Sequence, residues 1–421
     1  MDDCDVLVVG GGTAGTVAAI QSGRAGARTL LVEKNGMLGG TMTVGGVNNP
    51  GLFYAWGRQV IAGIGWELVT ATLAETDGAL PDFSNTELPH WRHHVRTDKA
   101  VFAALADQAA LDAGVELLLH SMIAGAAWDG EGWDVTLCTK SGLKPARCRV
   151  LVDCTGDANA VSLAGFQVVQ PDECQPGTLF VRVGGYDLSA LNLERISDAF
   201  KEAVRQGLVR ESDLWHGLEA APGFLRSHGG NCNHVIRIRA ATSEDRTQAE
   251  LEARRLLLRI YRLFRAQPGL EGLCIEEVSP ECGIRESVTI KGKKTITVED
   301  YLGGRVWDDA VCYSFYPIDL HKEVGGEGRR LDEGVVPTIP RGAMLPEGSR
   351  NIVAAGRCIS GDRLAHSAYR VEATCMATGQ AAGAMAALAA QRGVDVEDLP
   401  IGGVHDLLRA HGAIVPELRG T

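Results

Sequence analysis

The segment from Val6 to Glu33 constrains the fold of this chain more than any other part of the sequence. It contains an apolar β-branched run, Val6–Val9, a glycine-rich turn, a helix of small residues to about Ala25, and a second apolar run, Thr29–Val32. A strand that is apolar at consecutive positions is typical of a parallel sheet buried on both faces. The sequence therefore predicts an α/β fold that begins with a β-α-β unit.

Glycines in the turn between the first strand and the helix predict a dinucleotide-binding site. Gly10, Gly12 and Gly15 have the spacing G-x-G-x-x-G, with Thr13 and Ala14 between the last two. Gly10 permits the sharp turn, Gly12 lets the backbone approach a pyrophosphate, and Gly15 lets the helix pack closely on the sheet. The first helical turn, with Thr13 and Ala14, directs free N–H groups and the positive end of the helix dipole at the phosphates.

The residues after the second strand favour FAD over NAD. Glu33 is placed to accept hydrogen bonds from the hydroxyls of a ribose, and Lys34 follows it. An NAD-binding domain usually continues quickly to another helix and strand, whereas this chain inserts a polar, glycine-rich loop. The paired glycines Gly39 and Gly40, followed by Thr41, suit an extended flavin that bare backbone must approach. A flexible surface loop is the alternative.

A second turn of the nucleotide-binding type follows the apolar strand Val150–Val152. This strand leads into Thr155, Gly156 and Asp157. A strand that delivers Thr-Gly and then Asp at the edge of a sheet is typical of a turn that lies against a nucleotide. We therefore expect these three residues to contact the cofactor, with a plain turn as the alternative.

The segment from Asn351 to Leu388 predicts a return to the nucleotide-binding part. Asn351–Gly356 predicts a strand, and Thr378–Leu388 predicts a helix of small residues that packs closely on the sheet, with its N-terminal end toward the cofactor. The residues that we expect to contact the cofactor here are Gly356, Arg357, Asp362, Ala382 and Gly383.

Composition changes between these nucleotide-binding segments, from about residue 171 to 340. Arginines are more frequent there, and the capping box Thr247–Glu250 predicts a helix through Phe264. No second G-x-G-x-x-G follows a strand in this region, so the sequence predicts no separate NAD(P)H-binding domain. We expect a Rossmann-like FAD-binding domain in two parts, 1–170 and 341–421, with an inserted α+β substrate domain at 171–340.

The charge balance and the cysteines argue against other classes of protein. The chain has 41 Lys and Arg against 53 Asp and Glu, a net charge of −12, which argues against nucleic acid or an anionic membrane as partner. Its 11 cysteines form no C-x-x-C pair, which argues against an iron–sulfur cluster or a structural zinc site. Histidines 90, 93 and 94 converge poorly on a metal, so no metal is expected.

The first residues of the chain and the hydropathy of the whole sequence bear on the cellular location of the protein. Met1–Asp5 is acidic where a signal peptide would be basic, and no apolar run approaches about 18 residues. We expect a soluble, cytoplasmic protein with a small-molecule substrate, and assembly into a homo-oligomer is left open.

Several segments together resemble a known family of flavoenzymes. They are Val8–Glu33, Leu38–Thr41, Val150–Asp157, Gly230–His234, Gly283–Glu286, Tyr316–His321 and Asn351–Gly383. In these segments the chain is similar to FAD-dependent oxidoreductases with a glutathione-reductase-type FAD-binding fold, related to the succinate dehydrogenase and fumarate reductase flavoproteins. The resemblance implies an extended FAD, with its adenosine end at the first strand–helix turn and its flavin near Leu38–Thr41 and the C-terminal helix.

The resemblance also implies a residue that holds the substrate. Fumarate-reductase-like flavoproteins carry a His-x-x-x-Arg element after the late Ala-Gly turn, and its arginine binds a substrate carboxylate beside the flavin. His366 and Arg370 have the same residue types, spacing and place in the chain. A guanidinium can hold an anion, and an imidazole can exchange a proton near pH 7. The alternative is that both residues pair with local carboxylates such as Glu372.

Other candidates lie in the middle of the chain. Arg285, within Gly283–Glu286, is the nearest candidate for the proton-delivering arginine in the capping domain of fumarate reductases, although that arginine's own motif is not matched here. A structural Arg–Glu pair is the alternative. His321 and His234 lie in family-like segments, where each either faces the flavin or is a satisfied buried histidine.

The mode of FAD attachment follows from a departure from the family pattern. Succinate dehydrogenases attach FAD to a histidine shortly after the position that Glu33 occupies here. This chain has no histidine between Glu33 and Pro89, so we expect non-covalent FAD.

The expected reaction is hydride transfer between a small polar metabolite and flavin N5, as in a dehydrogenase or oxidase. An FAD-dependent alkene reductase or hydroxylase that uses NAD(P)H is the alternative among enzymes. A non-catalytic, flavin-binding regulatory protein is the alternative of another class. For that protein, His366, Arg370, His321 and Arg285 would face away from the isoalloxazine, whereas an enzyme needs several of them in one pocket.

Overall fold

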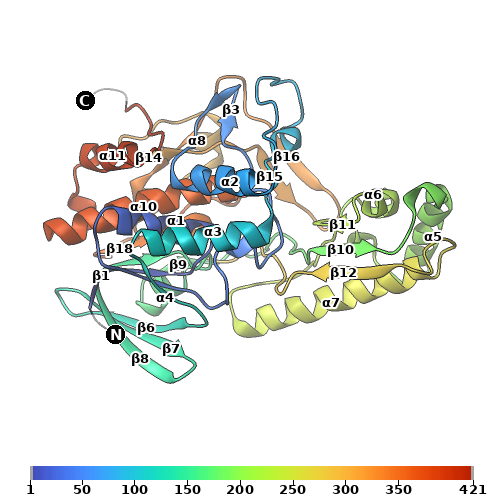
Figure 1. Ribbon diagram of the computed structural model, residues 1–421, viewed down its shortest axis with the longest axis horizontal. Coiled ribbons are helices and arrows are strands. Elements are labelled where there is room, and N and C mark those ends of the chain that lie inside the picture. The colour runs from blue at the N-terminus through green and yellow to red at the C-terminus, as the bar shows by residue number, and fades with distance from the viewer. Residues whose placement is uncertain (1–2, 419–421) are drawn as a thin grey trace.

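Parallel strands form the centre of the computed structural model, which describes residues 3–418 (Figure 1). Their order is β5 (Glu116–Leu118), β2 (Thr29–Val32), β1 (Cys4–Val9), β8 (Gly142–Asp153) and β18 (Ile352–Ala354). The first half of β8 instead pairs antiparallel with β7 (Trp133–Thr139), and β7 pairs with β6 (Met122–Trp128). The predicted α/β fold with a parallel sheet is confirmed, and so is the predicted β-α-β unit at its start.

Both faces of the central sheet are covered, which explains why β1 is apolar at consecutive positions. Val6 and Val8 belong to the core beneath α1 (Thr13–Arg24) and α10 (Glu372–Arg392). Leu7 and Val9 point the other way and pack with Trp133 of the β6–β7–β8 meander. Successive side chains of a strand alternate between its faces, so a strand between two cores needs an apolar residue at every position.

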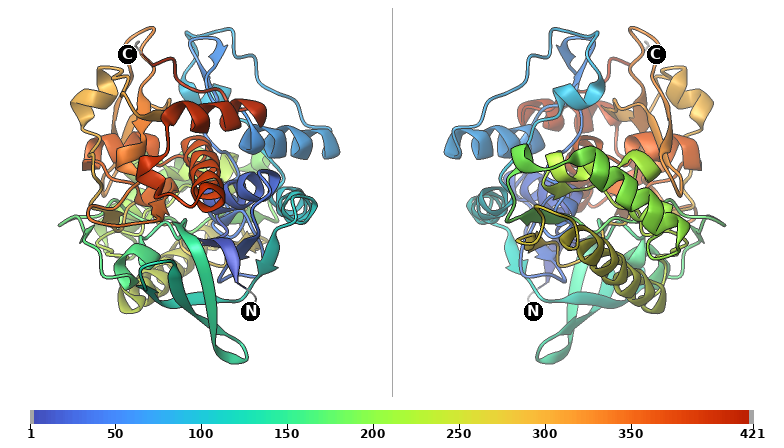
Figure 2. Two further views of the ribbon diagram at one scale, coloured as in Figure 1. Left: turned by 90° about the vertical axis from the view of Figure 1, so that its left-hand side faces the viewer. Right: turned by 90° about the vertical axis from the view of Figure 1, so that its right-hand side faces the viewer.

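Helices α1 and α10 lie next to each other above the sheet (Figures 1 and 2). Small residues allow this approach, because a Cβ at Gly379 would lie 2.1 Å from the carbonyl oxygen of Ala14, and one at Gly383 would lie 2.2 Å from that of Ala18. The predicted helix Thr378–Leu388 is only the middle of α10. Ala382 and Gly383 thus lie in the buried middle of α10 and not near its start. The helix end that faces the nucleotide-binding turns is at Glu372.

A second hydrophobic core lies in the region that we call the cap, residues 179–284 (right-hand side of Figure 1). Its elements are β10 (Val181–Gly184), β11 (Gly229–Gly230), β12 (Cys274–Val278), α5 (Leu193–Arg205), α6 (Ala221–Arg226) and α7 (Ser243–Arg265). Val288 and Ile290 join the core beneath the meander, and Ile296 to Leu345 contribute to the core around α10. The separately packed part of the chain thus ends near Ile284 rather than at the predicted residue 340.

Helix α7 begins earlier than predicted. The hydroxyl of Thr242 accepts a hydrogen bond from the backbone N–H of Asp245, and Thr242 has an extended backbone, as an N-cap residue does. Thr247 lies inside the helix, where its hydroxyl donates to the carbonyl of Ser243. The start predicted at Thr247 is wrong, because two successive capping patterns occur in the sequence, Thr242–Asp245 and Thr247–Glu250, and the first one caps the helix.

The remaining elements surround the sheet and the cavity described below. The helices are α2 (Ile64–Glu75), α3 (Lys99–Asp112), α4 (Asn159–Leu163), α8 (Val298–Leu302), α9 (Arg363–Tyr369) and α11 (Ile401–Ala410). Paired short strands are β3 (Tyr54–Ala55) with β4 (Arg58–Gln59), β9 (Val168–Val169) with β13 (Thr289–Ile290), β14 (Ala310–Tyr313) with β17 (Thr338–Pro340), and β15 (Ile318–His321) with β16 (Gly326–Arg329). Within residues 3–418, no helix is both long and apolar enough to cross a membrane.

Candidate functional site

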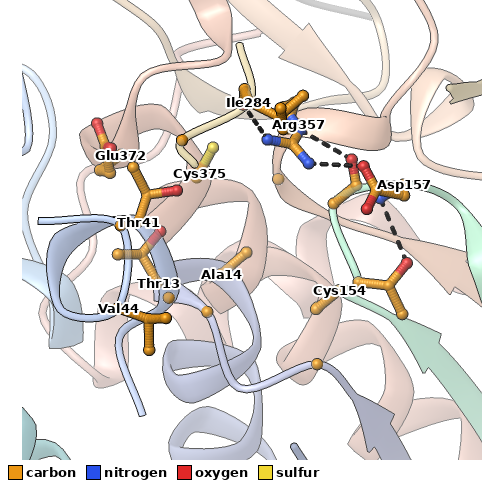
Figure 3. Close-up of a pocket in the computed structure, with 18 of the residues that line it drawn as sticks. Thr13, Ala14, Thr41, Val44, Cys154, Asp157, Ile284, Arg357, Glu372 and Cys375 are labelled. Atoms are coloured by element: carbon orange, nitrogen blue, oxygen red, sulfur yellow. Dashed lines mark hydrogen bonds and ion pairs between the residues drawn. The ribbon is translucent and has the colours of Figure 1, made fainter. Parts of the chain in front are cut away.

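A cavity of about 540 Å³ lies between the carboxyl ends of the parallel strands and the cap. Its walls come from the ends of β1, β2 and β8, the loop after β2, the segment 281–285 at the end of the cap, β15 and the start of α10. Ligands of open α/β sheets bind at this edge, outside the carboxyl ends of the strands. Figure 3 shows part of the cavity, with Thr13, Thr41 and Glu372 on one side and Asp157 and Arg357 on another.

Most of the residues predicted from separate parts of the sequence line this one cavity. The predicted cofactor-binding residues that line it are Gly10, Gly12, Thr13, Ala14, Glu33, Lys34, Gly40, Thr41, Thr155, Gly156, Asp157, Gly356 and Arg357. Of the predicted catalytic residues, Arg285, His321 and Arg370 line it.

Other predicted residues lie behind the cavity wall. A Cβ at Gly15 would lie 1.7 Å from the carbonyl oxygen of Gly10, so this glycine serves packing. Gly39 does not line the cavity either, and a Cβ there would lie 2.6 Å from the Thr43 side chain. The Asp362 carboxylate caps α9 instead of facing a ligand. It accepts hydrogen bonds from the backbone N–H of Ala365, at 2.8 Å, and from that of Val298, at 2.6 Å. Ala382 and Gly383 lie within the α1–α10 contact.

His366 is not brought into the cavity. Its side chain is 2% exposed, and its Nε2 lies 2.9 Å from the carbonyl oxygen of Arg357. Burial lowers its pKa to about 3, so the ring is neutral. The sequence suggested a catalytic pair because His366 and Arg370 are four residues apart, but α9 is short and turns only Arg370 toward the cavity.

The turn after β1 has the shape that a pyrophosphate requires. Gly10 has φ +94°, and a Cβ there would lie 2.5 Å from the carbonyl oxygen of Cys154. Nothing lies within 4 Å of the Cβ position of Gly12, which begins α1. Helix α1 has neither a side-chain cap nor an acidic residue in its first turn. Its first N–H groups are therefore available to an anion in the cavity.

Glu33 holds the turn in place from the end of β2. Its carboxylate accepts hydrogen bonds from the backbone N–H groups of Gly11, at 2.6 Å, and Asn35, at 2.7 Å. The side chain is 6% exposed, and burial raises its pKa. A carboxylate fixed in this way at the cavity wall fits the role of a ribose acceptor that the sequence predicts.

A charged network joins three segments of the wall at Asp157. The carboxylate of Asp157 accepts from Arg357 at 2.7 Å, from Arg246 of α7 at 2.6 Å, and from the hydroxyl of Ser287. Arg357 also donates to the carbonyls of Gly156 and Ile284 (Figure 3). Burial raises the pKa of Asp157, but the two guanidiniums outweigh it and hold the pKa below its usual range. Sequence reasoning missed Arg246, because nothing near it in the chain marks this partner.

At another part of the cavity, Arg370 has unused donors. Its Nη2 lies 3.3 Å from both the side-chain oxygen of Gln175 and the carbonyl oxygen of Asp319. Its Nε is buried and, like Nε2 of Gln175, has no hydrogen-bond partner within residues 3–418. Glu372 makes no ion pair with Arg370, but the carboxylate of Asp319 lies 3.9 Å from Nη2, so the predicted alternative of a local carboxylate partner remains for Arg370. Buried donors without acceptors indicate a place for a ligand that carries acceptors.

Arg285 faces the same part of the cavity from the position directly after the cap. Its guanidinium donates to the carbonyl of Pro176 at 2.7 Å and to the side chain of Asn231 at 3.3 Å. Burial and the nearby charge of Arg370 lower its pKa to about 10, so it remains charged at neutral pH. Glu286 binds other groups, so Arg285 is not part of the predicted Arg–Glu pair.

His321 completes this group, and its partner Asp319 was missed from the sequence. His321 Nε2 lies 3.2 Å from Oδ2 of Asp319, and the same oxygen lies 3.9 Å from Nη2 of Arg370. The two residues are two apart on β15, and this spacing on one strand is a signal that could have identified Asp319. Gln175 and Asn231 have no comparable signal.

Glu372, at the first position of α10, gives a pH-dependent prediction. Burial raises its pKa from 4.5 to about 7. Between these values the folded state holds a proton that the unfolded state has lost, so the free energy of unfolding falls as pH rises through this window. In protein freed of flavin, Glu372→Gln should therefore raise the free energy of unfolding at pH 8 by about 1–3 kcal/mol. At pH 4 the variant should gain nothing, and urea denaturation at both pH values measures the difference. An equal effect at both pH values would contradict the assigned shift.

Comparison with protein families shows one match along almost the whole chain. The model described as FAD dependent oxidoreductase matches residues 5–408.

Matches to individual proteins are shorter. The chain is 44% identical over 55 residues to dihydrolipoyl dehydrogenase 2, mitochondrial, of Arabidopsis thaliana, which is 13% of this chain and 11% of that protein. It is 40% identical over 79 residues to thiamine thiazole synthase of Aeropyrum pernix, 18% of this chain and 29% of that protein. The chain thus matches less than a third of the length of either relative.

Solved structures resemble the fold more broadly. Similar structures include p-nitrophenol 4-monooxygenase PnpA of Pseudomonas putida DLL-E4, with TM-score 0.44, 12% identity, and coverage of 97% of this chain and 84% of that one. Another is a geranylgeranyl bacteriochlorophyll reductase-like protein of Thermoplasma acidophilum, with TM-score 0.43, 13% identity, and coverage of 97% and 83%.

Proposed function

The chain belongs to the family of FAD dependent oxidoreductases, and from this premise we propose that it oxidises a small anionic hydroxy compound by transferring hydride to flavin N5. The reaction makes the protein a dehydrogenase or an oxidase. We also propose that the FAD-binding part has the glutathione-reductase-type fold and that the cap, residues 179–284, supplies one wall of the substrate site.

The turn after β1 and the carboxylate after β2 suit the adenosine half of FAD. The free N–H groups at the start of α1 would hold the pyrophosphate, and Glu33 would hold the ribose. Thr41, beyond the glycine pair, would line the flavin half of the site. When bound, FAD supplies an acceptor, N5 of its ring system, for a hydrogen that leaves carbon with both bonding electrons.

The observation that carries the proposal is the convergence of Arg285, His321 and Arg370. They come from the position directly after the cap, from β15 and from the end of α9, and they line one cavity with the dinucleotide-type turn. Two guanidiniums beside one cavity, of which Arg370 has an Nε without a partner among the described residues, suit a carboxylate, which two parallel N–H···O bonds can hold. The substrate that fits is therefore a small hydroxy carboxylate.

His321 would take the hydroxyl proton of the substrate. Burial, with the nearby charge of Arg285, lowers its pKa to about 4, so the ring is neutral at pH 7 and can accept a proton. Asp319 also lines the cavity, and its carboxylate, 3.2 Å from Nε2 of His321, would pass the proton to the ring. A positioned base of this kind contributes to oxidation because the hydroxyl proton must leave when carbon loses its hydride.

An anaerobic titration tests the proposed reaction through the visible flavin bands. We expect 2-hydroxy carboxylates to bleach the bands and NADPH or NADH to leave them unchanged. Rapid bleaching by a nicotinamide, with no response to any hydroxy carboxylate, would instead favour an alkene reductase or a hydroxylase. A preparation that cannot be reconstituted with FAD would contradict the family assignment itself.

FAD should be held without a covalent bond. We expect acid precipitation of the protein to release all of the flavin into the supernatant, because no histidine occurs in the segment from Glu33 to Pro89. Absorbance of supernatant and pellet measures this, and flavin that stays with the precipitate would show a covalent link elsewhere in the chain.

A further inference from the structure

A row of hydrogen-bond contacts leads from the cavity to the surface through two histidines. Asp319 Oδ2 lies 3.2 Å from His321 Nε2, His321 Nδ1 lies 3.1 Å from His234 Nε2, and His234 Nδ1 lies 3.2 Å from the carbonyl oxygen of Glu323. The side chains of His321 and His234 are 7% and 1% exposed. Glu323 lies in an exposed turn, so the row connects the cavity wall with solvent.

Counting hydrogens shows that this row is one proton short when both rings are neutral. Its two ends, the Asp319 carboxylate and the Glu323 carbonyl, are acceptors and carry no hydrogen. The three contacts therefore need three hydrogens, all from ring nitrogens. A neutral imidazole carries one hydrogen, so the two rings supply two. One contact is empty, and one added proton fills it.

We propose that His321 and His234 act together as a proton relay for the oxidation, which carries the substrate's hydroxyl proton from the cavity to the turn at Glu323. The proposal rests on the proposed function. The C–H hydrogen of the substrate leaves with its electron pair to the flavin, a C=O bond forms, and the O–H proton moves to the Asp319 carboxylate, which lines the cavity and passes it to Nε2 of His321. The hydrogen on Nδ1 of His321 then passes to His234, and the hydrogen on Nδ1 of His234 passes to water at the exposed turn of Glu323, because the backbone carbonyl there cannot take it up. Asp319 meets the substrate in this step, whereas His321 and His234 act through Asp319.

The groups around the rings of His321 and His234 disfavour a charged imidazole, so a proton that reaches either ring moves on. Arg285 and Arg370 face His321 with positive charge, Arg285 also faces His234, and burial acts in the same direction. Asp319 opposes them with negative charge at the cavity end. A proton is therefore accepted beside Asp319 but is not retained. The ring of Trp215 covers both imidazoles, with centroids 4.9 Å from His321 and 6.0 Å from His234.

The outer end of the relay is fixed by other contacts. The carboxylate of Glu323 binds Arg237 at 3.1 Å, and the backbone N–H of Gly325 donates to the carbonyl of Trp215 at 2.8 Å. These contacts hold the turn against the ring pair, so the carbonyl of Glu323 stays in reach of His234. The backbone carbonyl of Lys322 also faces His234.

The test follows the flavin and the released proton in the same reaction. Holoenzyme in weakly buffered solution is mixed anaerobically with a 2-hydroxy carboxylate, and a pH-indicator dye reports proton release while the flavin bands report reduction. In the native protein, release should coincide with bleaching. Glutamine at residue 234 can accept from His321 and donate to Glu323 but cannot pass a proton on. In His234→Gln, we expect release to lag behind bleaching by about 100-fold, the lower end of the usual contribution of a positioned proton-transfer group.

His228→Gln is the matched control. His228 lies in the cap, and its Nδ1 also faces a backbone carbonyl, that of Val183 at 3.3 Å, but it has no contact with the cavity. This variant should release protons together with bleaching. Equal timing of release and bleaching in His234→Gln would overturn the relay, even if bleaching itself were slower.

A second measurement tests the relay in the resting holoenzyme, with no substrate present. Ring ¹⁵N spectra of holoenzyme labelled at histidine count the hydrogens on the four ring nitrogens of His321 and His234. At pH 7.5 we expect two hydrogens, which leaves one contact free to accept a proton. Three hydrogens would overturn the relay, because the pair would already be full. If no hydroxy carboxylate bleaches the flavin, the proposed reaction fails, and the relay fails with it because it serves that oxidation. A count of three hydrogens overturns the relay alone and leaves the proposed reaction standing.

Discussion

Replacing Arg370 with methionine is expected to lower kcat/KM for a hydroxy carboxylate by about 10²–10³-fold. The guanidinium is 12% exposed and has a buried Nε without a partner among the described residues, so it is poised to bind the carboxylate. Removing one partner of a buried charge pair costs about 3–5 kcal/mol, and each 1.4 kcal/mol is a factor of ten. The flavin spectrum should be unchanged, because Arg370 is not among the residues expected to hold FAD.

Two variants separate the roles of charge and geometry at this position. Arg370→Lys keeps the charge but loses the planar fork, so we expect an intermediate kcat/KM with most of the loss in KM. Arg409→Met removes an exposed arginine of α11 that pairs with Asp406 at 3.2 Å, and it should leave turnover unchanged. If Arg370→Met oxidises the same substrate as fast as the native protein, the carboxylate site proposed here is wrong.

The change Gly379→Ala is expected to destabilise the protein by about 3 kcal/mol, at the upper end of what overpacking costs. The added Cβ would lie 2.1 Å from the carbonyl oxygen of Ala14 and 2.8 Å from its Cα. Both neighbouring atoms belong to the backbone of α1, so no side-chain rotation can relieve the clash. Because Ala14 lies in the dinucleotide-type turn, FAD affinity should fall as well. Urea denaturation and fluorescence titration with FAD measure the two effects.

Gly402→Ala provides the control for the same substitution in a helix. Nothing lies within 4 Å of the Cβ position of Gly402 in α11. Alanine restricts the unfolded chain more than glycine does, so this variant should be more stable by about 0.5–1 kcal/mol. Opposite signs for the two variants are the expected result. Unchanged stability of Gly379→Ala would mean that α10 and α1 do not limit the packing as described.

The first nucleotide-binding turn could be predicted from the sequence because its physical requirements are local. A strand, a turn and a helix start lie within a few residues of one another, and each glycine from Gly10 to Gly15 has its own steric reason. The predicted catalytic group was only partly right in position. Which face of a short helix points inward depends on what packs against it, and for this reason His366 was expected at the site. Asp319 lies on β15, where its spacing from His321 could have identified it.

Partners from distant segments could not be predicted in the same way. Arg246 of α7 binds Asp157, and the side chain of Gln175 binds Arg370, but neither contact has a pattern in the neighbouring residues. The start of α10 shows another limit of local reasoning. No proline or glycine separates residues 372 to 378, so the sequence does not distinguish a helix that begins at Thr378 from one that begins at Glu372.

The contact between α1 and α10 also sets the time at which the cofactor site can form. Helix α1 is synthesised early, whereas α10 and β18, which complete the same core, follow only after the whole cap has been made. Contacts between segments so far apart in a chain form slowly, because a long loop must close before they contribute. On the ribosome, the turn after β1 thus waits without its covering helix, and we expect FAD to bind only after α10 has emerged.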